Sequence, residues 1–357
     1  MNDEQAAFKL NMLYPKQWPY LTVLLALIIL FPLIFPSDYL ITVATLTGIY
    51  TMITIGLSLL LGYTGQISLG HAAYFGLGAY TSGILTAKFG LSPWLALLIA
   101  LMLTLVVAYL IGKPTLKLKG HYLALATVAF NIIVYTFFVS FYTLTGGASG
   151  LTGIPKLSLF GFTLTSHVAY YFLVWLVVLG IFLFSLNIVH SPVGRVLRGI
   201  HDSEIATIIQ GVDVSKYKIQ VFVLSAVFAS LAGSLYAHFV NFIAPPTFYV
   251  TKSIMFLMMV VIGGAHSLWG ALLGAIIITV LGESIGLFIP QSLHTGGEVE
   301  LIFYGLMLIL VIMFLPKGLI GLLTMVRDSL MHRFTPGKKE MPDRTVSPNE
   351  YSDLGRS

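Results

Sequence analysis

The sequence predicts an all-α, polytopic integral membrane protein with about ten transmembrane helices, some of them short or discontinuous. Hydrophobic residues make up 57% of the 357 residues and charged residues only 9%, whereas soluble domains carry about 25% charged residues. The mean hydropathy of +0.92 leaves too little charge for the mixed-sign surface of a soluble protein. The apolar residues also fall into separate runs of the length that a bilayer requires.

Ten apolar runs are candidate spans, because a helix needs about 17–25 mainly apolar residues to cross the hydrocarbon core. They are residues 20–36, 40–61, 66–87, 92–112, 120–142, 167–189, 217–243, 251–265, 268–289 and 299–316. The first run could imitate a secretory signal, but no small-residue cleavage site follows it, so we expect it to stay in place as a helix. The short run 251–265 is a candidate for a re-entrant or broken helix, which is tolerated only inside protein.

The basic residues predict the orientation, because cytoplasmic loops are enriched in Lys and Arg. If ten spans alternate, sixteen of the nineteen Lys and Arg fall on one side, and Lys88, Lys156 and Lys252 on the other. Both termini are therefore expected in the cytoplasm. The chain then divides into a cytoplasmic segment 1–19, a transmembrane domain 20–316 with a long cytoplasmic loop 190–216, and a cytoplasmic tail 317–357. The tail lacks apolar periodicity and is expected to be disordered.

Several function classes are disfavoured by what the sequence lacks. The absence of cysteine excludes disulfides, thiolate metal sites and cysteine nucleophiles. No G-x-x-x-x-G-K-[ST], H-E-x-x-H or G-x-S-x-G motif occurs, so we expect no ATP site, no metal site and no enzyme. His71 and His238 have no companion ligands at metal spacing. Nucleic-acid binding is not expected, because the pI of about 9.2 reflects scattered flanking charges rather than a basic patch.

Two segments, 65–71 and 263–267, mix glycine with Gln, Ser or His at a predicted membrane boundary. Paired interruptions of this kind are typical of discontinuous helices that line the substrate path of a transporter. Their free backbone groups could hold polar parts of a ligand. The candidate pathway residues are Gly65, Gln66, Ser68, Gly70, His71, Gly263 and Gly264. Close packing of helices is the alternative interpretation for most of the glycines in this chain.

Three polar residues inside the predicted spans are further candidates for the pathway. Glu283 is the only carboxylate well inside a predicted helix, where an acid is expected to be protonated or hydrogen-bonded within the bundle. Thr127 and Asn131 lie one turn apart on the same predicted helix face. They could face the pathway together, or they could hold neighbouring helices in place.

The loop 190–216 is the only sizeable polar stretch between predicted spans. Ser191 and the pair Asp202-Ser203 are predicted to cap two short helices, and Gly211 is predicted to end the second, 204–210. The apolar residues of this second helix form one face: Ile205, Ile208 and Ile209. This face favours a docking helix for a cytosolic partner. The alternative is a helix that packs back on the bundle or lies in the membrane interface.

At this loop the sequence resembles the permeases of branched-chain amino acid ABC transporters, in particular the LivM-like member of the permease pair. The resemblance begins at Ser191-Pro192-Val193-Gly194-Arg195, extends through the loop to residue 218, and is repeated in order by segments 62–72, 116–122, 145–155 and 260–270. The similar segments span about residues 40–320. One departure is Ala265-His266, where the family usually has Gly and a small residue, so the local turn is expected to differ.

The resemblance implies an importer of the bacterial inner membrane. A periplasmic binding protein delivers leucine, isoleucine, valine or a similar amino acid, and this chain and a homologous second permease form the pathway. Two cytosolic ATPases bind the ATP, so the chain itself needs no cofactor. The short loop helix inserts into a groove on the ATPase, and segment 146–153 faces the binding protein. By this resemblance the ATPase contact is made or shaped by Gly194, Arg195, Arg198, Asp202, Glu204, Ala206 and Gly211.

Two other functions stay open at this point. A urea or short-amide ABC permease shares most of these motifs, and the loop cannot separate it because the loop contacts the ATPase rather than the substrate. An ion-coupled secondary transporter or a channel belongs to a different class. Such carriers usually have several intramembrane carboxylates, whereas this chain has Glu283 alone well inside a span.

Overall fold

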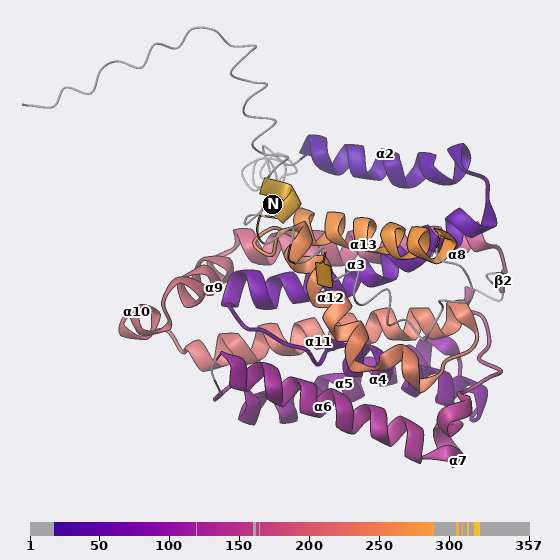
Figure 1. Cartoon of the computed structure of the whole chain (residues 1–357), viewed down its shortest axis with the longest axis horizontal. Helices are drawn as coiled ribbons and strands as arrows, with labels where there is room; N and C mark the ends of the chain where they lie inside the picture. The colour runs from indigo at the N-terminus through magenta and orange to yellow at the C-terminus, as the bar shows by residue number, and fades with distance from the viewer. Residues whose placement is uncertain are drawn as a thin grey trace, which may run out of the picture.

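The computed structural model describes residues 18–118, 120–159, 162–163 and 165–288, with a few positions beyond them: 305, 306, 309, 313 and 318–321. The described chain is a bundle of helices that run along one common direction (Figure 1). A two-stranded antiparallel ribbon of β1 (Ser158–Leu159) and β2 (Phe162–Thr163) pairs Ser158 with Thr163. The predicted all-α class is confirmed, with this small ribbon lying in a connection between helices.

Nine of the ten predicted spans coincide with a helix in the described residues. These helices are α2 (Trp18–Ile34), α3 (Asp38–Thr64), α4 (His71–Ala87), α5 (Pro93–Thr115), α6 (His121–Ser140), α8 (His167–His190), α11 (Val214–Val240), α12 (Val250–Gly263) and α13 (Leu268–Phe288). The predicted span 299–316 and the segments 1–19 and 317–357 lie almost entirely outside the described residues.

Helix length separates the spans into two groups. Five helices of 20–27 residues (α3, α5, α6, α8 and α11) are long and apolar enough to cross a membrane. By contrast, α4 has 17 residues and α12 has 14. At 1.5 Å per residue they extend only about 26 and 21 Å, which is less than the hydrocarbon core of about 30 Å. The predicted third span, 66–87, is therefore wrong at its start, because the helix begins at His71 and residues 66–70 are not helical.

The two ends of the bundle carry different structures. At one end lie two short helices outside the bundle, α9 (Pro192–Asp202) and α10 (Glu204–Ile209). At the opposite end lie the ribbon and α7 (Tyr142–Thr145), as Figure 1 shows. The turns η1 (Gly147–Ser149) and η2 (Pro245–Phe248) complete the described elements. We refer below to the α9–α10 end and to the ribbon end.

Helix α11 lies at the centre and packs against α3, α4 and α5. Its contact with α4 is one of backbone on backbone, because a Cβ atom added to Gly233 would lie 1.9 Å from the carbonyl oxygen of Phe75. The same is true in the other direction, where a Cβ atom on Gly78 would lie 2.0 Å from the carbonyl oxygen of Ser230. Small residues at such crossings allow helices to approach closely inside a membrane, so the packing interpretation holds for these glycines.

Replacement of Gly233 by Ala should destabilise the chain by roughly 1–3 kcal/mol, because the backbone atom that it meets cannot move aside as a side chain would. The matched control is Gly180→Ala on α8, where an added Cβ atom meets no atom within 4 Å. That change should be neutral or stabilising, since Ala is about 1 kcal/mol better than Gly in a helix interior. Thermal unfolding of the purified proteins in detergent measures both. Equal unfolding midpoints for the two variants would contradict the packing described here.

Candidate pathway and coupling site

The break between α3 and α4 begins at Gly65, which has a φ of +67°. This left-handed conformation carries no steric cost for glycine and is a common way to end a helix. The N–H of Gly65 donates to the carbonyl of Leu61 (3.0 Å), and the N–H of Gln66 donates to that of Leu60 (3.2 Å). The last carbonyls of α3 are thereby satisfied, and the chain turns back on itself.

Helix α4 starts deep in the bundle rather than at its end. The Nε2 atom of His71 lies 2.6 Å from Oγ of Ser225, and a Cβ atom added to Gly56 would lie 2.9 Å from the same Oγ. His71 therefore lies level with Gly56, which precedes the end of α3 at Thr64 by eight residues, or about 12 Å of helix rise. Residues 65–70 return into the bundle as non-helical chain, so the predicted discontinuous helix is found here.

Side chains from α6 and α12 hold this break. The N–H of Leu69 donates to Oγ1 of Thr127 (3.0 Å) and the N–H of Ala72 donates to Oγ of Ser253 (2.9 Å). The amide nitrogen of Asn131 also donates to Ser253 Oγ, at 3.4 Å. Thr127 and Asn131 thus share one face of α6, as predicted, and both act on the break. These hydrogen bonds hold neighbouring segments in place, which is one of the two roles considered from the sequence. The other role, lining the pathway, stays a prediction.

The predicted pathway residues near α4 lie close together, with Gln66, Ser68, Gly70 and His71 buried and Gly65 exposed where the break begins. Ser68 Oγ lies 3.2 Å from His71 Nδ1, and Gln66 donates to Oγ1 of Thr64 (2.9 Å). A Cβ atom on Gly70 would lie 3.1 Å from the carbonyl oxygen of Thr127. His71 and Asn131 are 0% exposed. We call this set the break cluster: Gly65, Gln66, Ser68, Gly70, His71, Thr127, Asn131, Ser225 and Ser253.

Helix α12 starts at the same depth as α4, because Ser253 lies in its first turn and bonds to the first turn of α4. The chain reaches α12 from the ribbon end through η2, whereas it reaches α4 from the α9–α10 end. Among the described residues, the side-chain oxygens Gln66 Oε1 and Asn131 Oδ1 are buried without a hydrogen-bond partner. The break cluster therefore retains spare acceptors for a polar ligand or for water.

Gly263 and Gly264 lie apart from the break cluster, and their place in a substrate path stays a prediction. They form the turn between α12 and α13 beside the end of α3, where Ser58 Oγ donates to the carbonyl of Ala265 (2.8 Å). Nδ1 of His266 donates to the carbonyl of Gly62 (2.9 Å). Ala265 does not need a left-handed backbone conformation in this turn, because among the described non-glycine residues only Asn241 has a positive φ.

Glu283 also lies apart from the break cluster. Its Oε2 accepts a hydrogen bond of 2.9 Å from the hydroxyl of Tyr39, the second residue of α3. This contact lies towards the ribbon end, and Glu283 is only half-buried. The expected position of this carboxylate well inside the bundle is therefore not what the structure shows.

The loop outside the bundle has the caps that the sequence predicts. Ser191 Oγ accepts from the N–H of Val193 (3.1 Å) and Ser203 Oγ accepts from the N–H of Ala206 (3.3 Å). Helix α10 ends at Ile209, and Gly211 follows with a φ of +80°. A left-handed position at this point favours glycine, so the predicted end of the helix is confirmed.

The two loop helices have opposite surroundings. The apolar side chains of α9 face inward, and Leu197 and Ile200 are buried. Those of α10 face outward, with exposed fractions of 70% for Ile205, 56% for Ile208 and 80% for Ile209. Helix α9 is therefore the anchor, and α10 presents an uncovered apolar face rather than packing this face back on the bundle. A position of α10 in the membrane interface stays an alternative to a docking helix.

The residues predicted to contact an ATPase divide into two groups. Arg195, Asp202 and Ala206 line a hollow of about 330 Å³ between α9 and α10. The others shape the loop itself. Glu204 forms an ion pair with Lys218 of α11, and Arg198 donates to the carbonyl of Val189 (3.1 Å). A Cβ atom on Gly194 would lie 2.1 Å from that same carbonyl oxygen, so the turn from α8 into α9 requires glycine there.

His201 contacts both interruptions, which the sequence did not predict. Its ring meets that of His266 edge-on, with 4.9 Å between the ring centroids, and a Cβ atom on Gly65 would lie 3.6 Å from its Cδ2. The end of α9 thus touches both interruptions. No spacing in the sequence relates positions 65, 201 and 266. The departure from the family pattern at His266 was the one sequence feature that could have indicated this contact. Within the described ranges no three His, Asp or Glu side chains gather as a metal site would require.

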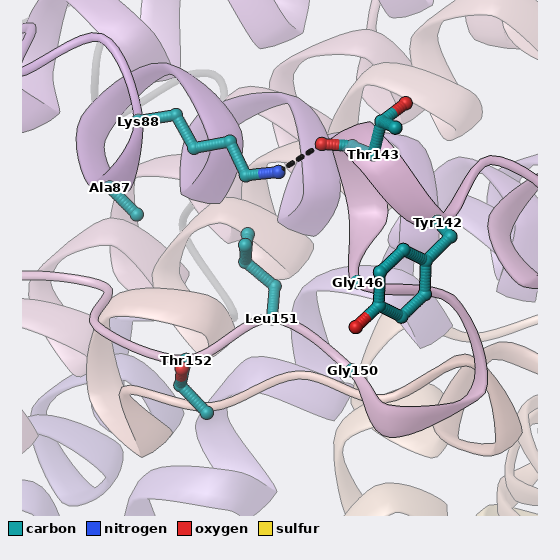
Figure 2. Close-up of a pocket in the computed structure, with 8 residues that line it drawn as sticks. All are labelled: Ala87, Lys88, Tyr142, Thr143, Gly146, Gly150, Leu151 and Thr152. Carbon is teal, nitrogen blue, oxygen red and sulfur yellow. Dashed lines mark hydrogen bonds between the residues drawn. The ribbon is translucent and has the colours of Figure 1, made fainter.

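A second hollow opens at the ribbon end, where Figure 2 shows Lys88 donating to the carbonyl of Thr143. Its volume is about 440 Å³, and it is lined by Ala87, Lys88, Tyr142, Thr143, Gly146, Gly150, Leu151 and Thr152. The glycine-rich segment 146–153 therefore borders a recess with one lysine at its rim. This is the segment that the family resemblance assigns to the binding protein.

A bundle of apolar helices, two of which start inside it, is typical of a transport subunit. The family model described as "Branched-chain amino acid transport system / permease component" matches residues 39–312. The chain belongs to this branched-chain amino acid transport permease family and is thus a multi-pass membrane permease of an ABC importer. This membership sets aside the ion-coupled carrier and the channel.

Individual relatives agree with this assignment. The high-affinity branched-chain amino acid transport system permease protein LivM of Escherichia coli K12 is 31% identical over 328 residues, which cover 85% of this chain and 75% of the relative. A probable LivM permease of Methanocaldococcus jannaschii is 24% identical, covering 76% and 90%. The E. coli permease LivH is also 24% identical, covering 78% and 92%. No solved structure matches the chain.

Replacement of Ser253 by Ala should cost roughly 1–3 kcal/mol, because the buried N–H of Ala72 and the amide of Asn131 both lose their acceptor. The control is Thr136→Ala on α6, an exposed residue that bonds only to the carbonyl of Ile132 in its own helix. That variant should stay within about 0.5 kcal/mol of the parent. Thermal unfolding in detergent compares the two. If both variants unfolded together with the parent, Ser253 would not be a support of the break.

Proposed function

We propose that this chain forms one half of the translocation pathway of a binding-protein-dependent importer for leucine, isoleucine, valine or a similar amino acid, in a bacterial inner membrane. The observation that carries the coupling part of this proposal is the uncovered face of α10, whose three isoleucines are 56–80% exposed. An apolar patch held outside the bundle by a capped, ion-paired loop marks a protein contact. Two ATPases are its proposed partners.

The ATP is bound by those partners, because the chain has no phosphate-binding loop of its own. The excess of Lys and Arg on the side of the α9–α10 end supports a cytoplasmic location for this end and for both termini. The hollow lined by Arg195, Asp202 and Ala206 lies between α9 and α10, in the same loop as the exposed isoleucines, so one partner could contact both. The ATPase groove would cover the apolar face and meet these charges at its rim.

Two links connect this docking surface to the bundle. One is the ion pair of Glu204 with Lys218, which ties α10 to the first turns of α11. The other is His201, which lies against His266 and next to Gly65. A displacement of the loop by the closing ATPases would therefore act on α11 and on both interruptions. The break cluster, together with a homologous second permease, would form the pathway, and the binding protein would dock at the ribbon end over the hollow beside Lys88.

Reconstitution tests this function. The chain is expressed with its neighbouring permease, ATPase and binding-protein genes, and labelled leucine uptake into proteoliposomes is measured. Uptake should require ATP and the binding protein. Uptake of leucine that needs neither would overturn the proposal. A binding protein that binds urea or short amides and not leucine would replace the substrate by that class while leaving the coupling scheme in place.

Replacement of Ile209 by Asp should weaken ATPase binding by about 1.5–3 kcal/mol, or roughly 10–100-fold, because a large apolar side chain is replaced by a charge that would be buried. Ile209→Leu is the matched control and should retain binding. Co-purification of the ATPase and uptake are the measurements, and the amount of permease in the membrane should not change. Undiminished ATPase recovery with the Asp variant would show that α10 does not dock there.

Replacement of His201 by Ala should leave ATPase binding intact and reduce the amount of leucine transported per ATP hydrolysed by several-fold, as expected for a contact that couples two sites with about 0.5–2 kcal/mol. His121→Ala, an exposed histidine in the first turn of α6 at the same end, is the control and should have no effect. A parent-like ratio in the His201 variant would remove this contact from the coupling route.

A further inference from the structure

The short turn η2 carries a phenylalanine into the interior of the bundle. Phe248 is the last residue of this turn and lies shortly before α12. Its side chain is only 1% exposed, although η2 belongs to the connection by which the chain enters α12 from the ribbon end. Connections between helices usually run over the surface, because their backbone groups need hydrogen-bond partners. The burial of a large ring from such a segment is therefore a distinctive feature of this end of the bundle.

Aromatic side chains from three helices surround Phe248. Its ring centroid lies 5.2 Å from that of Phe75 and 5.5 Å from that of Tyr80, both on α4. Phe138 of α6 and Tyr236 of α11 lie at 6.2 and 6.4 Å. These separations are within the range of favourable aromatic contacts. We call these four residues the aromatic cage of Phe248.

The packing in the cage leaves no room for a further side chain. A Cβ atom added to Gly76 would lie 2.7 Å from Cε2 of Phe138 and 3.0 Å from Cγ of Phe248. The rings of Tyr80 and Phe138 stack on each other, with 4.2 Å between their centroids. The space between α4, α6 and η2 is thus filled by aromatic rings. A constriction with an apolar lining of this kind excludes water and polar solutes.

The cage lies between the break cluster and the ribbon end. Helix α4 starts in the break cluster at His71 and is followed at the ribbon end by its C-cap residue Lys88. Phe75 and Tyr80 follow His71 by four and nine residues, so they lie about 6 and 14 Å further along the helix. A solute that moved along α4 from the ribbon end to the break cluster would therefore meet Phe248 and its cage first.

A backbone contact joins η2 to the surface of the ribbon end. The N–H of Leu151 donates to the carbonyl of Ile243 (2.8 Å), and the N–H of Ile243 donates to that of Leu151 (3.1 Å). Leu151 lines the hollow shown in Figure 2, and Ile243 precedes η2 by two residues. A Cβ atom on Gly150 would lie 2.5 Å from the same carbonyl oxygen of Ile243. A movement of the segment 146–153 would therefore act on η2 through backbone contacts.

We propose that Phe248 is the external gate residue of the pathway. Its ring closes the route from the ribbon end to the break cluster, and it leaves the cage when a binding protein docks on the segment 146–153. This inference rests on the proposed function, because it takes the ribbon end as the external side. Withdrawal of Phe248 exchanges many weak apolar contacts and breaks no hydrogen bond of its own side chain. The closed gate keeps external solutes from the break cluster until the binding protein has docked.

The test uses the absence of cysteine from the chain. Ser68→Cys places one thiol in the break cluster, and a membrane-impermeant maleimide is added outside spheroplasts that contain the assembled transporter without its binding protein. The chain is then recovered by an affinity tag, and its labelling should be slow while Phe248 is in place. Phe248→Ala should raise the labelling rate roughly tenfold or more, because the cage is left unfilled. Phe248→Leu keeps a smaller apolar side chain in the cage and should give a smaller increase.

Two controls accompany these variants. Phe182→Ala removes an equally buried ring of α8 that contacts Trp269 of α13 and lies outside the cage. It should loosen the bundle, as thermal unfolding measures, yet leave the labelling of Ser68→Cys slow. Lys88→Cys places the thiol at the exposed rim of the hollow and should label rapidly, whichever residue occupies position 248.

Slow labelling of Ser68→Cys in both Phe248 variants would overturn the inference, as would rapid labelling with Phe248 in place. Equal labelling in Phe182→Ala and Phe248→Ala would also overturn it, because any loosening of the bundle would then admit the reagent. Failure of Lys88→Cys to label from outside would instead refute the external location of the ribbon end, which belongs to the proposed function. The same comparison in inverted membrane vesicles would then decide whether Phe248 closes this end.

Discussion

A backbone N–H or carbonyl group that leaves a helix at membrane depth must find another partner, because no bulk water is available there. This constraint organises the centre of the molecule. The non-helical residues 65–70 and the open first turn of α4 are supplied with acceptors by Thr127 and Ser253. Those acceptors come from α6 and α12, and His71 meets Ser225 of α11. The helices around the break, α6, α11 and α12, therefore each present a hydroxyl group to it.

Glycine is required at two places where backbones approach closely. Helix α11 can reach the break only because it crosses α4 with no side chain between the two backbones at Gly233. The turn from α8 into α9 is equally tight at Gly194. The crossing of α11 with α4 and the turn from α8 into α9 are thus held by backbone contacts, which give way less readily than side chains. A displacement of α9 would therefore move its neighbours rather than be absorbed by rearrangement of side chains.

The sequence predicted what depends on local pattern. The positions of nine helices, the serine caps of α9 and α10, and the apolar face of α10 all follow from hydropathy, capping and periodicity over a few residues. The start of α4 at His71 was missed because Gln66, Ser68 and Gly70 lie between apolar residues, and average hydropathy does not register which backbone groups are bonded. The contact of His201 with His266 depends on residues far apart in the chain, for which no local signature exists.

Helices α4 and α12 start beside one another, although the chain leads into them from opposite ends of the bundle. Each end of the bundle is thus connected to the same interior point by a stretch of irregular chain. Irregular chain can be rearranged by exchanging side-chain hydrogen bonds one at a time, whereas unwinding a helix breaks several backbone bonds together. In the proposed pathway, these two segments would act as separate gates, so that a small molecule could be released on one side while the other side stays closed.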